Sequence, residues 1–119
     1  MEIKDATSSF SALSQPTRLK ALRLLLRHEP DGLPAGEIAR SLDVPHNTLS
    51  AHLTVLAGAG WVSSRRESRS IIYRANLDHM QQVLTFLVSD CCNGDPILCA
   101  PLVDALTACS SSSTKEPLP

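Results

Sequence analysis

The chain has 119 residues, of which 43% are hydrophobic and only 3% aromatic, so it can build one small core and is too short for two ordinary domains. It has no run of about 18 apolar residues and no secretory signal pattern, which predicts a cytoplasmic protein with no membrane partner. The net charge is −1, but residues 40–75 hold five basic against two acidic groups, which predicts a locally positive face for phosphates.

The first predicted element is a helix that begins near Ser14 and ends at the helix-breaking residues 30–32. Ser14 is a favourable N-cap, and Pro16 falls in the first turn, where proline is tolerated best. A second, shorter helix is predicted over residues 34–44. Apolar positions recur at helical spacing in both. They are Leu19, Leu22, Leu25 and Leu26 in the first helix, and Ile38, Ala39 and Leu42 in the second.

A third helix is predicted over residues 46–58, directly after Pro45. Leu49, Leu53 and Leu56 form one apolar stripe along it, and the glycines at its end favour termination. Short polar or small residues lie away from this stripe or at its edge, where an external partner can reach them. They are His46, Asn47, Thr48, Ser50, Ala51 and His52.

The pattern next changes from helical to alternating. Val62 and residues 71–73 are strand formers, and the polar segment 63–70 between them is predicted to form the tip of a two-stranded ribbon. This segment carries three arginines, Arg65, Arg66 and Arg69.

A last helix is predicted from residue 77 or 78 to Cys92. Its apolar face would comprise Met80, Val83, Leu84, Leu87 and Val88, and His79 is expected to be solvated. Residues 110–119 are of low complexity, and we expect them to form a disordered tail.

The order of these elements predicts the fold. A helix, a short helix, a helix, a basic ribbon and a final helix make a winged helix-turn-helix, a mainly α fold with a small β-hairpin. In such a fold the third helix buries its leucines and offers its polar N-terminal residues to the major groove, whose width admits a helix. The ribbon arginines then lie near phosphates or the adjacent minor groove. Double-stranded DNA is therefore the predicted partner.

Three segments resemble the ArsR (ArsR/SmtB) family of metal- and metalloid-responsive repressors over about residues 8–92. They are "LSQPTRLKALRLL", "GEIARSLDVPHNTLSAHLTVLAGAGWV" and "SRRESRSIIYRAN". The resemblance implies a homodimer, formed by the N-terminal segment and the last helix, that occupies an operator until an inducer binds. It makes residues 1–109 one DNA-binding and dimerisation domain.

The resemblance also limits where the inducer-binding site of this chain can lie. Some members carry a Cys-x-Cys in the first helix of the helix-turn-helix, but here that segment is "EIARSLDV". Zinc and nickel sensors use an Asp/His pair early in the last helix and a His/Glu pair late in it. Here Asp78 and His79 are adjacent and no later histidine follows in that helix. What remains is a cysteine cluster at its end, which is similar to a subset of arsenite-responsive members.

Three thiols within nine residues, Cys91, Cys92 and Cys99, fit that chemistry. Trivalent arsenic is thiophilic, and three thiolates satisfy its pyramidal geometry. Side chains of adjacent helical residues diverge by roughly 100°, so Cys91 and Cys92 can share one ion only if the helix end yields. Cys109 is expected to be a small hydrophobic residue. The expected inducer is As(III), with Sb(III), methylated arsenicals, Bi(III) and Cd(II) left open, and no catalytic cofactor is expected.

Two alternatives remain for the thiols. In one, the same DNA-binding fold carries a redox or persulfide switch in which two cysteines bond on oxidation. In the other, the chain is a small thiol enzyme with Cys91 or Cys92 as its nucleophile. The enzyme is disfavoured because the chain has no Cys-x-x-Cys motif and no evident general base beside these thiols.

Overall fold

The computed structural model describes residues 1–91, 100–101 and 104–105, and the chain falls into two compact units, Met1–Leu84 and Thr85–Pro119. The predicted ligands Cys92 and Cys99, as well as Cys109 and the predicted tail 110–119, lie outside the described residues. Within the part of the chain that is described, no helix is both long and apolar enough to cross a membrane.

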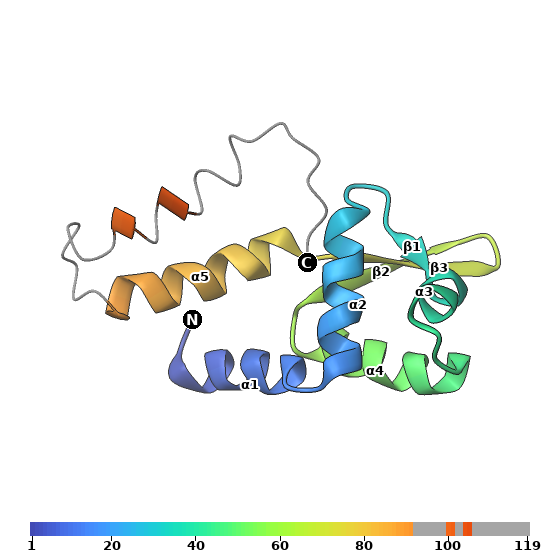
Figure 1. Ribbon diagram of the computed structural model, residues 1–119, viewed down its shortest axis with the longest axis horizontal. Helices are drawn as coiled ribbons and strands as arrows, with labels where there is room; N and C mark the ends of the chain where they lie inside the picture. Colours follow the sequence, from blue (N-terminus) through green and yellow to red (C-terminus); the bar gives the residue numbers. More distant parts are fainter. Residues whose placement is uncertain (92–99, 102–103, 106–119) are drawn as a thin grey trace. The chain divides into compact units, whose positions relative to one another are not determined.

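The elements follow the predicted order, with an additional helix at the start and an additional strand (Figure 1). The fold is a winged helix-turn-helix, mainly helical with a small antiparallel sheet, which confirms the predicted fold class. Its helices are α1 (Ile3–Leu13), α2 (Pro16–Arg27), α3 (Ala35–Leu42), α4 (His46–Gly58) and α5 (Leu77–Cys91), and its strands are β1 (Leu33–Pro34), β2 (Val62–Glu67) and β3 (Ser70–Ala75).

The start of α2 differs from the prediction by one residue. Gln15 is the N-cap, and its side-chain Oε1 accepts the backbone N–H of Arg18 at 3.0 Å, while Pro16 takes the first helical position. Ser14 instead ends α1, where its backbone N–H bonds the carbonyl of Ser11. Helix α1 itself was not predicted. It begins with a capping box of Glu2 and Asp5.

The sheet has the order β1-β3-β2, and all its pairs are antiparallel. Strands β2 and β3 pair from Val62–Ala75 to Glu67–Ser70, so only Ser68 and Arg69 form the turn between them. The predicted eight-residue tip is therefore wrong in size, because its polar residues pair as strand. Ser68 turns the chain with a positive φ of 57°. We call β2, the turn and β3 the wing.

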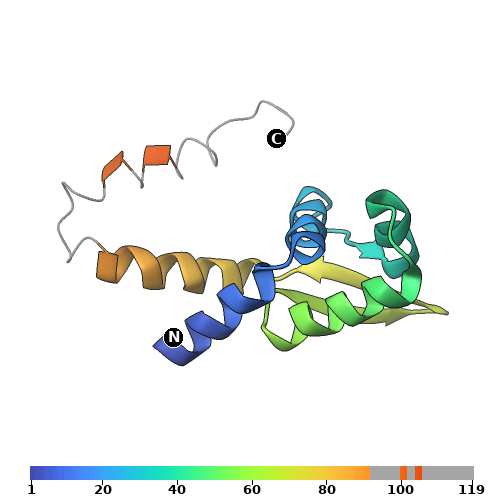
Figure 2. The ribbon, with the colours of Figure 1, turned by 60° about the horizontal axis from the view of Figure 1, so that its bottom comes forward.

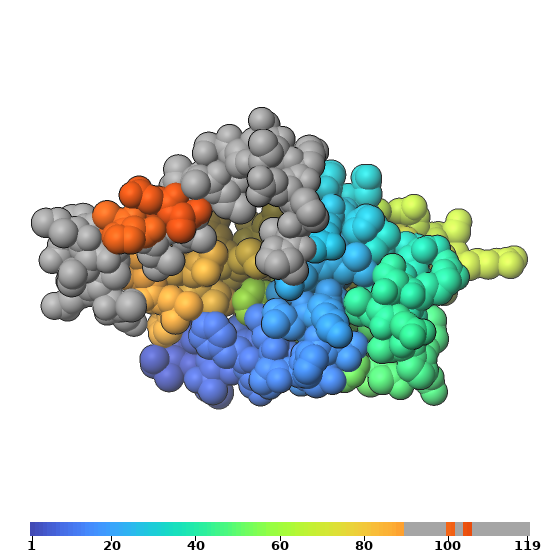
Figure 3. All heavy atoms as spheres, in the orientation of Figure 1, coloured from blue at the N-terminus to red at the C-terminus, as the bar shows by residue number. Residues whose placement is uncertain are grey.

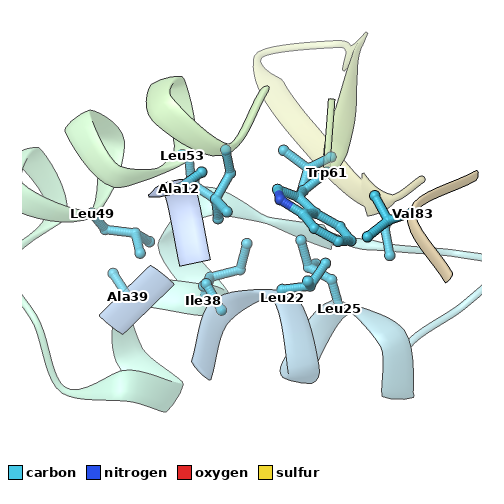
Figure 4. Packing of buried hydrophobic residues seen from close by; sticks show 13 residues of the cluster. Ala12, Leu22, Leu25, Ile38, Ala39, Leu49, Leu53, Trp61 and Val83 are labelled. Atoms are coloured by element: carbon cyan, nitrogen blue, oxygen red, sulfur yellow. The ribbon is translucent and has the colours of Figure 1, made fainter. Parts of the chain in front are cut away.

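The core forms where α2, α3 and α4 meet Trp61 and Val83 (Figure 4). The predicted leucine stripe of α4 is confirmed, since Leu49, Leu53 and Leu56 are each 0% exposed. Leu22 and Leu25 of α2 are buried as well, whereas Leu19 is 42% exposed. Because this stripe is buried, the opposite face of α4 is the one exposed to solvent.

Candidate nucleic-acid interface

The first turn of α4 presents polar side chains to solvent. His46, Asn47 and Thr48 are exposed, while Leu49 next to them is fully buried. Ser50 is half-buried and Ala51 exposed. This turn contains no acidic residue, so nothing in it repels a phosphate. The predicted reading residues thus lie on the outer face of a helix whose inner face is anchored in the core.

His52 differs from the other predicted reading residues because it has a partner within the chain. Its ring is half-buried, and its Nδ1 lies 3.3 Å from Nη1 of Arg18 on α2. A guanidinium can only donate, so Nδ1 of His52 is the acceptor of this contact. Arg18 also donates from Nε to the carbonyl of Ala12 at 2.6 Å. Arg18, which was not predicted as a site residue, therefore holds the outer edge of α4 against α2 and the end of α1.

The three wing arginines are not equivalent. Arg65 pairs with Glu67, with Nε and Oε2 3.0 Å apart, and donates from Nη2 to the carbonyl of Asp31 at 3.2 Å. Among the described residues, Arg66 and Arg69 have no ion pair or side-chain hydrogen bond. Arg65 is therefore partly neutralised within the chain, and Arg66 and Arg69 remain available to an anion.

The strand register places Arg65 and Arg66 on opposite faces of the wing. Residues directly paired across an antiparallel ladder share a face, and the face alternates along each strand. Arg66 pairs with Ile71 and so shares a face with Tyr73, two residues further along β3. Arg65 pairs with the buried Ile72 on the other face.

A hollow of ≈280 Å³ lies between the start of α3, the start of α4 and the wing. The wing turn and the start of α4 lie at the same end of the first unit (Figure 2). His46 and Ser50 of the third predicted helix meet Arg69 of the predicted ribbon tip at this hollow, although the sequence placed them in two separate segments. Its full lining is Pro34, Ala35, Gly36, His46, Ser50, Arg69, Ser70, Ile71 and Tyr73. Neither Gly36 nor Tyr73 was predicted from the sequence to be a site residue.

Beyond the opposite end of α4 three residues meet at a junction, in which Ser9 and Trp61 are buried and His79 is half-buried. Ser9, only 1% exposed, has its Oγ 2.9 Å from Nε2 of His79, and its carbonyl accepts Nε1–H of Trp61 at 2.7 Å. The rings of Trp61 and His79 meet edge to face with centroids 4.9 Å apart. The prediction that His79 is solvated is therefore wrong, because its ring packs on Trp61 and bonds α1. We call Ser9, Trp61 and His79 the junction.

Gly60 completes the junction. Its φ is +93°, and a Cβ built there would lie 2.8 Å from Nδ1 of His79. Glycine is therefore required both by the backbone and by the imidazole packed over it. Burial lowers the pKa of His79, so the ring is neutral at physiological pH.

The predicted inducer ligands are not brought together by the described part of the structure. Cys91 is the last residue of α5, and Cys92 and Cys99 lie beyond the described residues. Within the described ranges, no group of three or more His, Cys, Asp or Glu residues is placed to hold a metal ion. The cysteine cluster stays a prediction from the sequence.

Comparisons with known proteins agree with this geometry. A family model described as a helix-turn-helix domain matches residues 13–65. The transcriptional repressor SdpR of Bacillus subtilis is 31% identical over 86 residues, which cover 72% of this chain and 92% of that protein. A probable mercury resistance operon repressor of Streptomyces lividans is 36% identical over 64 residues, 54% of this chain and 49% of that protein.

Solved structures of similar fold are also transcriptional regulators. An ArsR-like transcriptional regulator from Rhodococcus sp. RHA1 superposes with a TM-score of 0.68 at 28% identity, covering 93% of this chain and 96% of that one. The homodimeric winged helix-turn-helix DNA-binding domain of a possible ArsR-family regulator from Mycobacterium bovis gives a TM-score of 0.61 at 28% identity, over 74% and 81% of the two chains. These homologues are transcriptional regulators and not enzymes. The chain belongs to the ArsR/SmtB family of winged helix-turn-helix transcriptional repressors.

Proposed function

We propose that this chain is a homodimeric repressor whose ligand-free form binds an operator through α4 and the wing. The observation that carries the proposal is the coincidence of the exposed polar turn of α4 with unpaired cations of the wing. His46, Asn47 and Thr48 project from a helix anchored by its leucines. Arg69 shares a hollow with that same helix end. A major groove takes the helix, and the phosphates beside it take the wing arginines.

The dimer is supported by apolar side chains left exposed on α1 and α5. Ile3 and Phe10 of α1 are 69% and 43% exposed, and they lie seven residues apart and so on one helix face. Leu77 and Leu84 of α5 are 53% and 38% exposed at the same spacing. Neighbouring apolar residues of this size mark an interface more often than free surface. A second copy of this chain is the proposed partner, as in the homodimeric Mycobacterium bovis relative.

For the inducer we propose As(III) bound by the thiolates of Cys91, Cys92 and Cys99. The donor set supports this, because three soft sulfurs within nine residues suit a thiophilic ion and poorly suit a hard one. The Streptomyces lividans relative, a probable mercury resistance operon repressor, points to the same class of soft ion. A ligand at the C-terminal end of α5 would act on one of the two helices proposed to form the dimer.

The proposal is tested by titrating the reduced protein, bound to a duplex that it selects from a randomised pool, with As(III), Cd(II), Zn(II) and an oxidant. Fluorescence anisotropy of the duplex reports release. We expect one As(III) per protomer to weaken binding at least tenfold, a coupling of about 1.4 kcal/mol. If the oxidant alone released the duplex, the hypothesis of a redox switch would replace that of a metalloid inducer.

Single cysteine variants locate the ligands. Cys91→Ser, Cys92→Ser and Cys99→Ser should leave DNA affinity unchanged and raise the As(III) concentration needed for release. Cys109→Ser is the matched control and should respond like the wild type. A Cys99→Ser that responds like the wild type, combined with an unresponsive Cys109→Ser, would make Cys109 the third ligand in place of Cys99.

A further inference from the structure

The hollow between α3, α4 and the wing has a lining suited to an anion. Arg69 contributes a cation that has no ion pair among the described residues, and no Asp or Glu lines the hollow. His46, Ser50 and Tyr73 add polar groups able to hydrogen-bond an oxygen. A volume of ≈280 Å³ is about nine times the share of one water in the liquid, so a group of several heavy atoms fits.

Gly36 is the unexplained residue of this lining. It lies in the first turn of α3, and a Cβ built on it would meet no atom within 4 Å beyond the adjacent residues and the nearby backbone of its own helix. Its φ is not in the left-handed region, unlike those of Gly32 and Gly60. Alanine would therefore fit without a clash and would favour the helix by up to about 1 kcal/mol. Nothing within the described chain requires glycine here.

A ligand from outside the chain would explain why position 36 is a glycine. Gly36 lines the same hollow as Arg69, and because it has no Cβ it lets a ligand approach the backbone closely. We propose that the hollow is a subsite for one phosphate of the DNA backbone, held by Arg69 and admitted by Gly36. The inference rests on the DNA-binding function proposed above and deepens it, because it fixes where the duplex backbone passes between α3 and the wing. The wing tip projects beyond α3 (Figure 3).

The chain contains a matched control in Gly58. It is also helical, at the end of α4, and a Cβ built on it would likewise meet nothing within 4 Å. Gly58 does not line this hollow. Gly36→Ala and Gly58→Ala thus each add one methyl group to an open helical position, and only the first adds it to the lining of the proposed phosphate subsite, since Gly58 lines a different hollow beside Ser9 and His79.

The test measures duplex binding by wild type, Gly36→Ala, Gly58→Ala and Arg69→Gln across a range of salt concentrations. Two probes are used, a duplex selected by the wild type from a randomised pool and a random-sequence duplex of equal length. Urea unfolding of each variant is measured alongside. We expect both alanine variants to be at least as stable as the wild type. Gly36→Ala should lose about tenfold in affinity for both duplexes, and Gly58→Ala should lose nothing.

Arg69→Gln connects the loss to the phosphate. In the proposed homodimer each protomer contributes one Arg69, so this variant should reduce the magnitude of the slope of log affinity against log salt by about 0.9 per protomer, or about 1.8 for the dimer. Because Arg69 and Gly36 share one ligand, the double variant should lose less than the product of the two single losses.

Several outcomes would overturn the inference. Wild-type affinity of a stable Gly36→Ala, or a loss confined to the selected duplex, would mean that the hollow takes no backbone phosphate. A Gly36→Ala less stable than Gly58→Ala would make its effect structural and count against the subsite. Failure of the wild type to select any duplex from the pool or to bind random-sequence DNA would instead remove the proposed DNA-binding function itself, so the two failures are distinct.

Discussion

The two ends of α4 contrast in how many of their polar groups find partners inside the chain. At the start, His46, Asn47 and Thr48 are exposed, and no side chain caps the first turn. Past the other end, Trp61 donates to Ser9, which also bonds His79, and all three belong to one packed junction. Groups satisfied within the chain fix geometry, whereas exposed and unpaired groups await a ligand. Substitutions at the two ends should therefore differ in kind.

The largest effect is expected at the junction. Trp61→Ala removes a side chain that is 3% exposed and leaves the Ser9 carbonyl without its indole donor. We expect the free energy of unfolding in urea to fall by about 3–5 kcal/mol. DNA affinity should fall with it, because the end of α4 loses its anchor. A variant of normal stability would show that the junction does not hold α4.

At the opposite end, Asn47→Ala should act on recognition and leave stability nearly unchanged. Asn47 is exposed and has no side-chain hydrogen bond among the described residues, so its loss costs the fold little. If it reads a base edge, affinity for the selected duplex should fall by about 1–3 kcal/mol while random-sequence binding stays the same. Thr54→Ala, on the same helix, is the control, since that hydroxyl bonds only the Ser50 carbonyl. Equal losses for the two variants would contradict a reading role for Asn47.

The wing offers a finer comparison between neighbouring arginines. Arg66→Gln should weaken binding to any duplex and reduce the magnitude of the salt slope by about 0.9 per protomer, or about 1.8 for the dimer, because Arg66 has no partner in the described chain. Arg65→Gln should change that slope less, since Arg65 is already paired with Glu67 and the Asp31 carbonyl. A larger slope change for Arg65→Gln would show that its ion pair opens on DNA.

The smallest expected effect is a pH dependence of stability. Burial lowers the pKa of His79 in the folded protein, so between that value and the ordinary one of about 6.5 the unfolded chain binds more protons. The contribution of the neutral ring is therefore fully present above about pH 6.5 and is lost as the pH falls below it. Unfolding in urea at about pH 7.5 and about pH 5.5 measures the loss. His79→Gln should lose less stability over this interval than the wild type does.

Much of this architecture could be predicted because it depends on local patterns. The leucine spacing of α4 fixes its buried face, and the order of elements fixes the fold class. Helix α1 escaped prediction because its segment is rich in serine and threonine, although Glu2 and Asp5 at its start carried a capping signal. The cysteine cluster remains a prediction, since its residues after Cys91 lie outside the described chain.

Contacts between distant segments could not be predicted. Ser9 and His79 are 70 positions apart, and nothing in either local pattern pairs them. The inequivalence of Arg65 and Arg66 follows from the strand register, which depends on the two-residue turn at Ser68. A role for Gly36 could not be predicted from the sequence, because it depends on the open space around this residue in the folded chain.

The uncapped start of α4 has a consequence for hydration. Pro45 offers no side-chain acceptor to the first N–H groups of the helix, whereas Gln15 caps α2. In the free protein those amides depend on solvent, so they should exchange their hydrogens faster than the rest of α4. A duplex that docks there replaces water as the acceptor and exchanges one set of hydrogen bonds for another. Such an exchange adds little net affinity but orients the helix. The first turn of α4 therefore becomes fully hydrogen-bonded and ordered only when it binds DNA.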